Sequence, residues 1–120
     1  MVCIVSGATG CLGLNLTQRL IKEGHEVIAL GRNEILGTIV SKMGAHFIAV
    51  DLHDKNQLKK ITPKAQTIFH CAALSSPWGR YKDFYAANVL GTQHMIEATP
   101  EATRFIHVSS PSIYFNFTEQ

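Results

Sequence analysis

The chain alternates short apolar runs with longer segments that mix apolar and polar residues at helical spacing. Several apolar runs are continuous, as in parallel strands that are buried on both faces. The predicted strands are Val2–Ser6, Val27–Leu30, Phe47–Val50, Thr67–Cys71 and Arg104–Val108. The predicted helices between them are Leu12–Glu23, Glu34–Met43, Lys55–Lys60 and Tyr81–Ala98. This alternation predicts an α/β fold.

Two glycines, Gly24 and Gly44, follow the first two predicted helices and are expected to cap their C-termini. Regular alternation of strands and helices is typical of a Rossmann-type doubly wound parallel sheet. We expect right-handed crossovers and the strand order 3-2-1-4-5. Ligands of such sheets bind at the carboxyl ends of strands one and four, where the winding reverses.

The first apolar run leads directly into the glycine-rich segment Gly7-Ala8-Thr9-Gly10-Cys11-Leu12-Gly13. Leu12, Leu16 and Leu20 follow at helical spacing, with polar residues between them, which predicts an amphipathic helix. A strand, a tight glycine turn and a helix together place a pyrophosphate at the helix N-terminus. The alternative is an ordinary glycine-rich turn without a ligand.

Each glycine of this turn has its own expected role. Gly7 would let the chain leave the strand, and Gly10 would let backbone N–H groups approach a phosphate. Gly13 would let the helix lie close to the first strand. The spacing is GxxGxxG, one residue longer in its first gap than GxGxxG.

The end of the second predicted strand bears on the choice of dinucleotide. An acidic residue there would accept hydrogen bonds from ribose hydroxyls and favour NAD, but this chain has Arg32. A guanidinium suits the additional phosphate of NADP, although the nearby Glu34 opposes it. Arg32 as a solvated loop residue is the alternative.

Composition excludes several classes of function. The chain has 120 residues, enough for one core, and its net charge of +2 predicts no nucleic-acid or anionic membrane surface. No apolar stretch approaches the roughly 20 residues that span a bilayer, and no basic region precedes the first strand. We therefore expect a cytoplasmic protein without a membrane segment.

The cysteines and histidines could in principle act as nucleophiles or metal ligands, but we expect neither role. Cys3, Cys11 and Cys71 lack CxxC or metal-ligand spacing, which predicts free buried thiols, with Cys11 as a small apolar filler. The six histidines form no HxH or HxxxH pair, so no metal site is expected. His70 and His107 are predicted to pack in the core or to support a site from behind it.

Five segments occur in the order and spacing of a known family. They are Ser6–Gly13, Val50–Leu52, His70–Ala73, Asn88–Thr92 and Val108–Ser110. In these segments the chain resembles the extended short-chain dehydrogenase/reductase family, also described as NAD-dependent epimerases and dehydratases.

Two further segments, Ser75–Gly79 and Ser110–Phe115, look most like the branch of 3β-hydroxysteroid dehydrogenases and sterol decarboxylases. That branch also includes bacterial reductases of long-chain 3-keto acids. The resemblance implies NADP or NAD as cofactor, and Arg32 favours NADP slightly.

The resemblance implies roles at matching positions. Asp51 would accept a hydrogen bond from the adenine amine while Leu52 packs on the ring; alternatively, Asp51 caps the helix that begins near Asp54. Ser110 would be catalytic and hydrogen-bond the substrate oxygen. With the glycine turn and Arg32 included, the predicted cofactor-binding residues are Gly7, Thr9, Gly10, Cys11, Leu12, Gly13, Arg32, Asp51, Leu52, Cys71, Ala72, Ala73, Asn88 and Ser109.

Four of these positions have a more specific implied role. Ala72 and Ala73 would leave room for the cofactor, and Asn88 would tie its helix to the turn after the fourth strand. Ser109 would lie nearer the nicotinamide, and the helix Tyr81–Ala98 is implied to be the contact of a homodimer.

The family's general acid/base is a tyrosine in a YxxxK motif, and no such motif occurs in residues 1–120. The family places that motif later than this chain extends. We therefore expect residues 1–120 to be the N-terminal part of a dinucleotide-binding domain. It would stop before the sixth strand and the substrate domain, and it would be inactive alone.

Three functions of the whole protein remain open, each acting on or binding a small molecule. The first is an oxidoreductase that interconverts a secondary alcohol and a ketone. The second is a nucleotide-sugar epimerase or dehydratase. The third is a dinucleotide-binding regulator without catalysis, which would keep the glycine turn and lack YxxxK.

Overall fold

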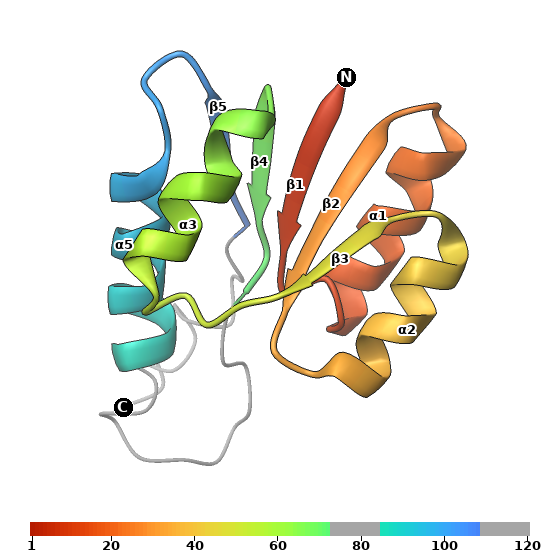
Figure 1. Cartoon of the computed structure of the whole chain (residues 1–120), viewed down its shortest axis with the longest axis horizontal. Coiled ribbons are helices and arrows are strands. Elements are labelled where there is room, and N and C mark those ends of the chain that lie inside the picture. The colour runs from red at the N-terminus through yellow and green to blue at the C-terminus, as the bar shows by residue number, and fades with distance from the viewer. Residues whose placement is uncertain (73–84, 109–120) are drawn as a thin grey trace, which may run out of the picture.

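The computed structural model describes residues 1–72 and 85–108, which form one parallel sheet with helices on both faces (Figure 1). The strand order is β3-β2-β1-β4-β5, which confirms the predicted order. The strands are β1 Val2–Ser6, β2 Glu26–Gly31, β3 His46–Ala49, β4 Thr67–His70 and β5 Arg104–His107. The helices are α1 Cys11–Lys22, α2 Glu34–Met43, α3 Lys55–Ile61, the 3₁₀ turn η1 Thr62–Lys64, the π-helix η2 Tyr85–Leu90 and α5 Gly91–Ala98.

Strand β1 lies at the centre of the sheet and pairs with β2 on one side and β4 on the other. Its last residue, Ser6, is in register with Leu30 of β2 and His70 of β4. All pairings are parallel, so the carboxyl ends of the strands share one edge. The winding reverses between β1 and β4, and the glycine turn directly follows the carboxyl end of β1.

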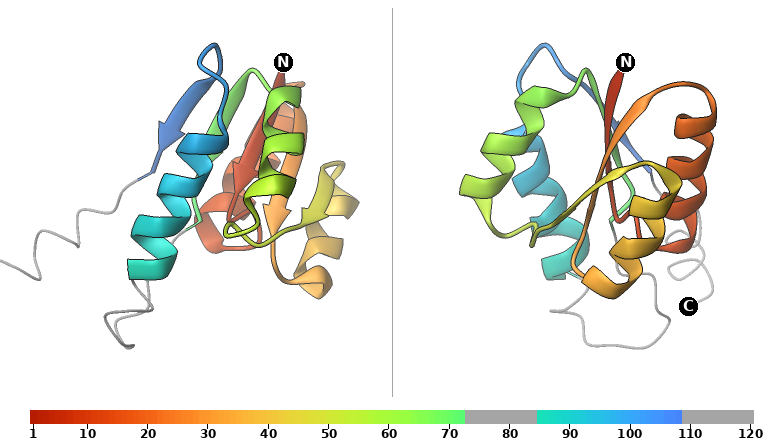
Figure 2. Two further views of the ribbon diagram at one scale, coloured as in Figure 1. Left: turned by 60° about the vertical axis from the view of Figure 1, so that its left-hand side comes forward. Right: turned by 45° about the vertical axis from the view of Figure 1, so that its right-hand side comes forward.

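Helices α1 and α2 cover one face of the sheet, and α3 and α5 cover the other (Figure 2). Alternate residues of β1 serve the two faces. Ile4 joins the core under α3 and α5, with Leu58 and Met95, whereas Cys3 and Val5 join the core under α1 and α2. Both faces need apolar side chains, which explains the continuous apolar runs.

Local signals fix several helix ends. The side chains of Asn33 and Asp54 cap α2 and α3 by accepting hydrogen bonds from the amides of Leu36 and Gln57. Gly44 ends α2 in a left-handed conformation with φ +108°. Gly24 follows α1 with φ +91°, so the predicted role of both glycines is confirmed.

The predicted apolar stripe of the first helix is confirmed at Leu20, which is buried, and at Leu16, which packs against the core, but it is wrong at Leu12. Leu12 is 54% exposed, and the buried residues of α1 are Gly13, Thr17 and Leu20. The close approach of Gly13 to the turn sets which face of the helix meets the sheet. Thr17 is therefore fully buried, and its hydroxyl has no hydrogen-bond partner among the described residues.

The predicted continuous helix Tyr81–Ala98 is also corrected, in the part that the structure describes. Residues 81–84 lie outside the described part of the chain. Residues 85–90 form a π-helix, and of the described residues of this segment only Gly91–Ala98 are α-helical. The Thr92 hydroxyl donates to the carbonyl of Asn88, four residues earlier, at the junction. The wider π-turn inserts one residue, which a hydrophobic period does not reveal. The other predicted elements either match or differ by one residue at one or both ends.

Candidate dinucleotide site

The glycine turn has the backbone conformation that its sequence predicts. Gly7 has φ +66°, and a Cβ there would lie 2.7 Å from the backbone of Ala72. A Cβ on Gly13 would lie 2.1 Å from the Gly7 carbonyl oxygen. Glycine at both positions is therefore a steric requirement of the turn.

Gly10 differs from the other two glycines of the turn, Gly7 and Gly13, because it has open space beside it. It is the N-cap of α1, with extended backbone angles, and its amide donates to the Gly7 carbonyl at 3.1 Å. A Cβ on Gly10 would meet one atom, that same carbonyl oxygen at an ordinary 3.4 Å. A Cβ at Gly10 would thus fit the fold and project into the space beside the turn.

The N-terminus of α1 has the chemistry of an anion site. No side chain caps it, and no acidic residue occurs in its first turn. The amides of the first helical turn have no acceptor within a helix, and the helix dipole places partial positive charge there. Cys11, Leu12 and Gly13 form this first turn. The arrangement fits a pyrophosphate.

Behind the turn, three buried or half-buried side chains join β1, β4 and α5. Ser6 Oγ lies 2.7 Å from His70 Nδ1, and His70 Nε2 lies 2.9 Å from Thr92 Oγ1. Ser6 Oγ also accepts hydrogen bonds from the amides of Cys71 and Ala72, at 3.1 and 3.2 Å. These contacts hold the end of β4 against the glycine turn.

His70 is confirmed as a packed group. It is 1% exposed, and burial, followed by the charge of His107, lowers the pKa of its imidazole to about 4. His70 is therefore neutral near neutral pH. His107 stacks on it with ring centroids 5.6 Å apart but is itself exposed. His107 does not pack in the core, because it lies on the edge strand β5, but its stacking on His70 is consistent with the alternative prediction that it supports the site from behind.

Arg32 follows the end of β2 and is exposed. A Cβ on the preceding Gly31 would lie 3.2 Å from the Thr9 side chain, so this strand end adjoins the glycine turn. Arg32 forms no ion pair with any residue in the ranges 1–72 and 85–108. Its guanidinium is free to meet a ligand at the same edge of the sheet.

Asp51 lies in the loop between β3 and α3 and is exposed. One carboxylate oxygen accepts a hydrogen bond from the amide of His53 at 2.9 Å. The alternative prediction, that Asp51 caps the following helix, is wrong because Asp54 is the cap. Leu52 is half-buried and packs against the core under α3 and α5.

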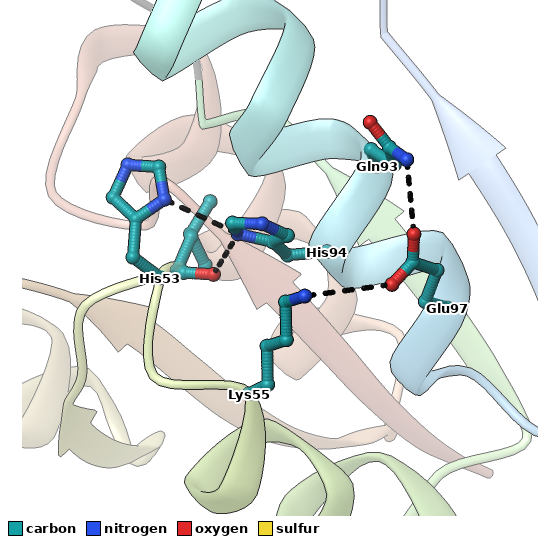
Figure 3. Close-up of polar contacts among 6 residues, drawn as sticks. His53, Lys55, Gln93, His94 and Glu97 are labelled. Carbon is teal, nitrogen blue, oxygen red and sulfur yellow. Dashed lines mark hydrogen bonds and ion pairs between the residues drawn. The ribbon is translucent and has the colours of Figure 1, made fainter.

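Polar contacts fasten this loop to α5 (Figure 3). His94 Nδ1 lies 3.1 Å from the Leu52 carbonyl oxygen and 3.2 Å from His53 Nδ1. One turn further on, Lys55 and Glu97 form an exposed ion pair of 3.9 Å. Two imidazoles alone make a poor metal site, and the described residues contain no group of three side chains that could hold a metal ion.

The cysteines differ from prediction in one respect. Cys3 is buried and Cys71 half-buried, and burial raises the pKa of both thiols. Cys11 is exposed, so the expectation of buried thiols is wrong for this cysteine, which lies in the glycine turn. Cys11 is the first residue of α1 and therefore lies at the edge formed by the carboxyl ends of the strands.

The structure thus brings most predicted site residues to one edge, while Ala73, Ser109 and Ser110 lie outside the described residues. Asn88 belongs to the π-helix, and its carbonyl accepts from Thr92. The sequence analysis did not find Ser6 and Thr92. Ser6 is the last residue of one predicted strand and His70 the last but one of its neighbour, and these polar residues were the signal that could have found this contact.

A hollow of about 540 Å³ lies elsewhere, between α2 and β3. It is lined by residues that include Glu34, Thr38 and Phe47. It is open and contains none of the predicted binding residues, so we do not assign the dinucleotide to it. In the part of the chain that is described, no helix is long and apolar enough to cross a bilayer.

Residues 3–120 match the model of the NAD dependent epimerase/dehydratase family. The chain therefore belongs to the NAD-dependent epimerase/dehydratase family, as its motifs predicted. It is 41% identical to the uncharacterized protein YbjS of Escherichia coli, over 98% of this chain and 36% of that protein.

A second relative is the 4-hydroxy-2-methyl-3-oxo-4-farnesyl-3,4-dihydroquinoline-1-oxide ketoreductase of Stigmatella aurantiaca. It is 36% identical, over 94% of this chain and 34% of the relative. The chain thus spans about a third of the length of these relatives. The predicted branch is also represented, by a 3β-hydroxysteroid-dehydrogenase/decarboxylase of Arabidopsis thaliana at 30% identity.

Among solved structures, UDP-glucose-4-epimerase from Stenotrophomonas maltophila, crystallised with bound NAD, is similar with a TM-score of 0.82. The match covers 95% of this chain and 38% of the epimerase at 20% identity, which shows a shared fold. The predicted Rossmann-type class is therefore confirmed.

Proposed function

We propose that this chain is the dinucleotide-binding part of an oxidoreductase that interconverts a secondary alcohol and a ketone. The observation that carries the proposal is the N-terminus of α1, uncapped by any side chain and preceded by a turn with open space at Gly10. This feature lies where the winding of the sheet reverses, the usual ligand position in such folds.

Each part of the site has a proposed role. The amides of the first turn of α1 hold the pyrophosphate, and the small residues Gly7 and Ala72 let the chain pass close to it. Asp51 accepts a hydrogen bond from the adenine amine, and Leu52 packs on the ring. When bound, NAD or NADP supplies the atom that accepts or donates the hydride.

Ser110 is proposed to hydrogen-bond the substrate oxygen, and Ser109 to lie near the nicotinamide. Family membership and the resemblance at Val108–Ser110 support these roles. Because no YxxxK motif occurs in residues 1–120, we propose that these residues alone do not turn over substrate.

Relatives support a ketone as the substrate class. The relative from Stigmatella aurantiaca is a ketoreductase, and a 32% identical relative from Stenotrophomonas maltophilia is a 2-alkyl-3-oxoalkanoate reductase. Interconversion at a nucleotide sugar is the second candidate, since the matched family is named for epimerases and dehydratases.

The test uses the protein that the complete reading frame encodes, here called the complete protein. NAD and NADP are titrated first, and hydride transfer is then followed with 3-hydroxy steroids, long-chain 3-keto acids and UDP-sugars. Net oxidation or reduction of an alcohol or ketone supports the proposal. UDP-sugar interconversion without net cofactor turnover would favour the epimerase, and binding without turnover a regulator. No binding of either dinucleotide would overturn the proposal.

A further inference from the structure

A buried polar relay lies directly behind the glycine turn and has no role in the function proposed so far. Ser6 is fully buried and His70 is 1% exposed, and they end neighbouring strands in register. Thr92 of α5 completes the relay on the far side of the imidazole. Buried polar groups are costly unless every donor and acceptor is paired.

The hydrogen bonds of Ser6 determine whether His70 Nδ1 carries a proton. The amides of Cys71 and Ala72 can only donate. Ala72 donates to Ser6 Oγ, and Cys71 shares its hydrogen between Ser6 Oγ and the Ser6 carbonyl oxygen, at 3.1 and 3.2 Å. Two donated hydrogen bonds use both lone pairs of that oxygen. The Ser6 hydroxyl hydrogen is therefore directed to His70 Nδ1, which must be unprotonated.

The hydrogen bonds of Thr92 require the same protonation state of the His70 imidazole. The Thr92 hydroxyl donates its single hydrogen to the Asn88 carbonyl at 2.9 Å. Its oxygen can therefore only accept from His70 Nε2, which must carry the proton. Both ends require the neutral Nε2–H tautomer, and every polar atom of the relay is paired.

The relay also determines where the end of β4 lies relative to the turn. Ser6 holds the Ala72 amide, and the Ala72 backbone lies against Gly7, where a Cβ would come within 2.7 Å of it. A shift of Ala72 toward the turn would collide with Gly7, and a shift away would break its bond to Ser6. The turn and the relay therefore form one packed unit.

We propose that the Ser6–His70–Thr92 relay is the positioning element of the phosphate turn, holding Gly7 and Ala72 in the spacing that admits a dinucleotide. Thr92 and His70 act through Ser6 and touch no ligand themselves. This inference rests on the proposed function, because it assigns the relay to the same site.

The test compares three variants of the complete protein. Thr92→Val removes the hydroxyl while keeping the shape, and Thr92→Ser keeps the hydroxyl. Thr99→Val is the matched control, because the Thr99 hydroxyl also donates to a carbonyl of α5, that of Met95, but lies outside the relay. Dissociation constants for NAD and NADP are measured together with hydrogen exchange of the Ala72 amide in unliganded protein.

We expect Thr92→Val to weaken both dinucleotides about tenfold and to speed Ala72 exchange, because loss of one buried partner loosens the whole relay. Thr92→Ser and Thr99→Val should resemble the parent in both measurements. Nitrogen NMR of the parent should show His70 as the neutral Nε2–H tautomer.

Unchanged affinity and unchanged exchange in Thr92→Val would overturn the inference, even if that variant is less stable. The other tautomer of His70 would overturn it as well. A parent that binds no dinucleotide would instead overturn the proposed function. The exchange and NMR measurements would then still decide whether the relay positions Ala72.

Discussion

The two ends of the candidate site are built in different ways. The phosphate end, Ser6–Gly13 with His70–Ala72, consists of constrained backbone in front of a buried relay. The adenosine end, Gly31–Glu34 with Asp51–His53, presents the exposed side chains of Arg32 and Asp51. The first end is determined by sterics and burial, and the second by a few solvent-facing groups.

This difference separates affinity from selectivity. The pyrophosphate is common to NAD and NADP, so the phosphate end can hold both but cannot distinguish them. Only the adenosine end can read the additional phosphate of NADP. Changes at the phosphate end should therefore affect both cofactors together, whereas changes at the adenosine end should affect one of them.

Arg32→Ala should show the difference between the two ends of the site with a large effect on one cofactor only. A charge-assisted hydrogen bond to the additional phosphate would be lost, so NADP affinity should fall roughly ten- to a hundredfold, with NAD nearly unchanged. Dissociation constants for both cofactors at fixed ionic strength measure this effect. The control is Arg104→Ala, because Arg104 is exposed at the first residue of β5, away from the carboxyl edge.

Two results would contradict this role of Arg32. One is a parent that prefers NAD tenfold or more, in which case Glu34 outweighs the guanidinium. The other is an equal loss for both cofactors in Arg32→Ala, which would make Arg32 a general support of the loop.

Acid should destabilise the fold through the phosphate end. Burial lowers the pKa of His70 to about 4, from an ordinary 6.5, so the folded state prefers neutral imidazole. The unfolded chain binds the proton more readily between these values, and the stabilisation present above pH 6.5 is lost as pH falls toward 4. Between pH 7 and pH 5 the loss is about 2 kcal/mol.

Urea unfolding of the parent and His70→Gln at several pH values measures this loss. The variant should be less stable at pH 7 but should lack the His70 share of the acid sensitivity. Parallel pH curves for the two proteins would mean that His70 already titrates alike in the folded and unfolded states.

Thr17→Val should have the smallest effect. Thr17 belongs neither to the phosphate end nor to the adenosine end of the site. It replaces a buried hydroxyl that has no described partner with a methyl group of similar shape, so stability should rise by about 1 kcal/mol. Thr62→Val is the matched control: Thr62 is equally buried, but its hydroxyl donates to the Ala98 carbonyl, so this change should destabilise. Thermal unfolding compares them, and a destabilised Thr17→Val would show that the hydroxyl is paired.

The sequence was most informative where local geometry decides the structure. Positive φ values and close approaches need glycine, so the turn could be predicted from Gly7, Gly10 and Gly13. Strand order followed from continuous apolar runs alternating with helices. Asn88 within a helix was notable as a residue type, but the π-turn around it left no trace in the hydrophobic period.

Contacts set by tertiary packing were less accessible to sequence reasoning. Leucine spacing placed Leu16 and Leu20 correctly but was wrong at Leu12, because the approach of Gly13 turns Leu12 outward and places Thr17 in the core. Likewise, the partners of His70 come from a strand and a helix distant in sequence. Register at the strand ends would have suggested Ser6, but nothing local indicates Thr92.

The most direct test of the central claim is the affinity of Gly10→Val for NAD and NADP in the complete protein. The fold has room for a Cβ at Gly10, whereas a pyrophosphate on the N-terminus of α1 would collide with the valine side chain. Calorimetric titration should show both affinities falling by more than about a hundredfold, with the thermal unfolding midpoint nearly unchanged. Parent-like affinity in a folded Gly10→Val protein would mean that the phosphates bind elsewhere.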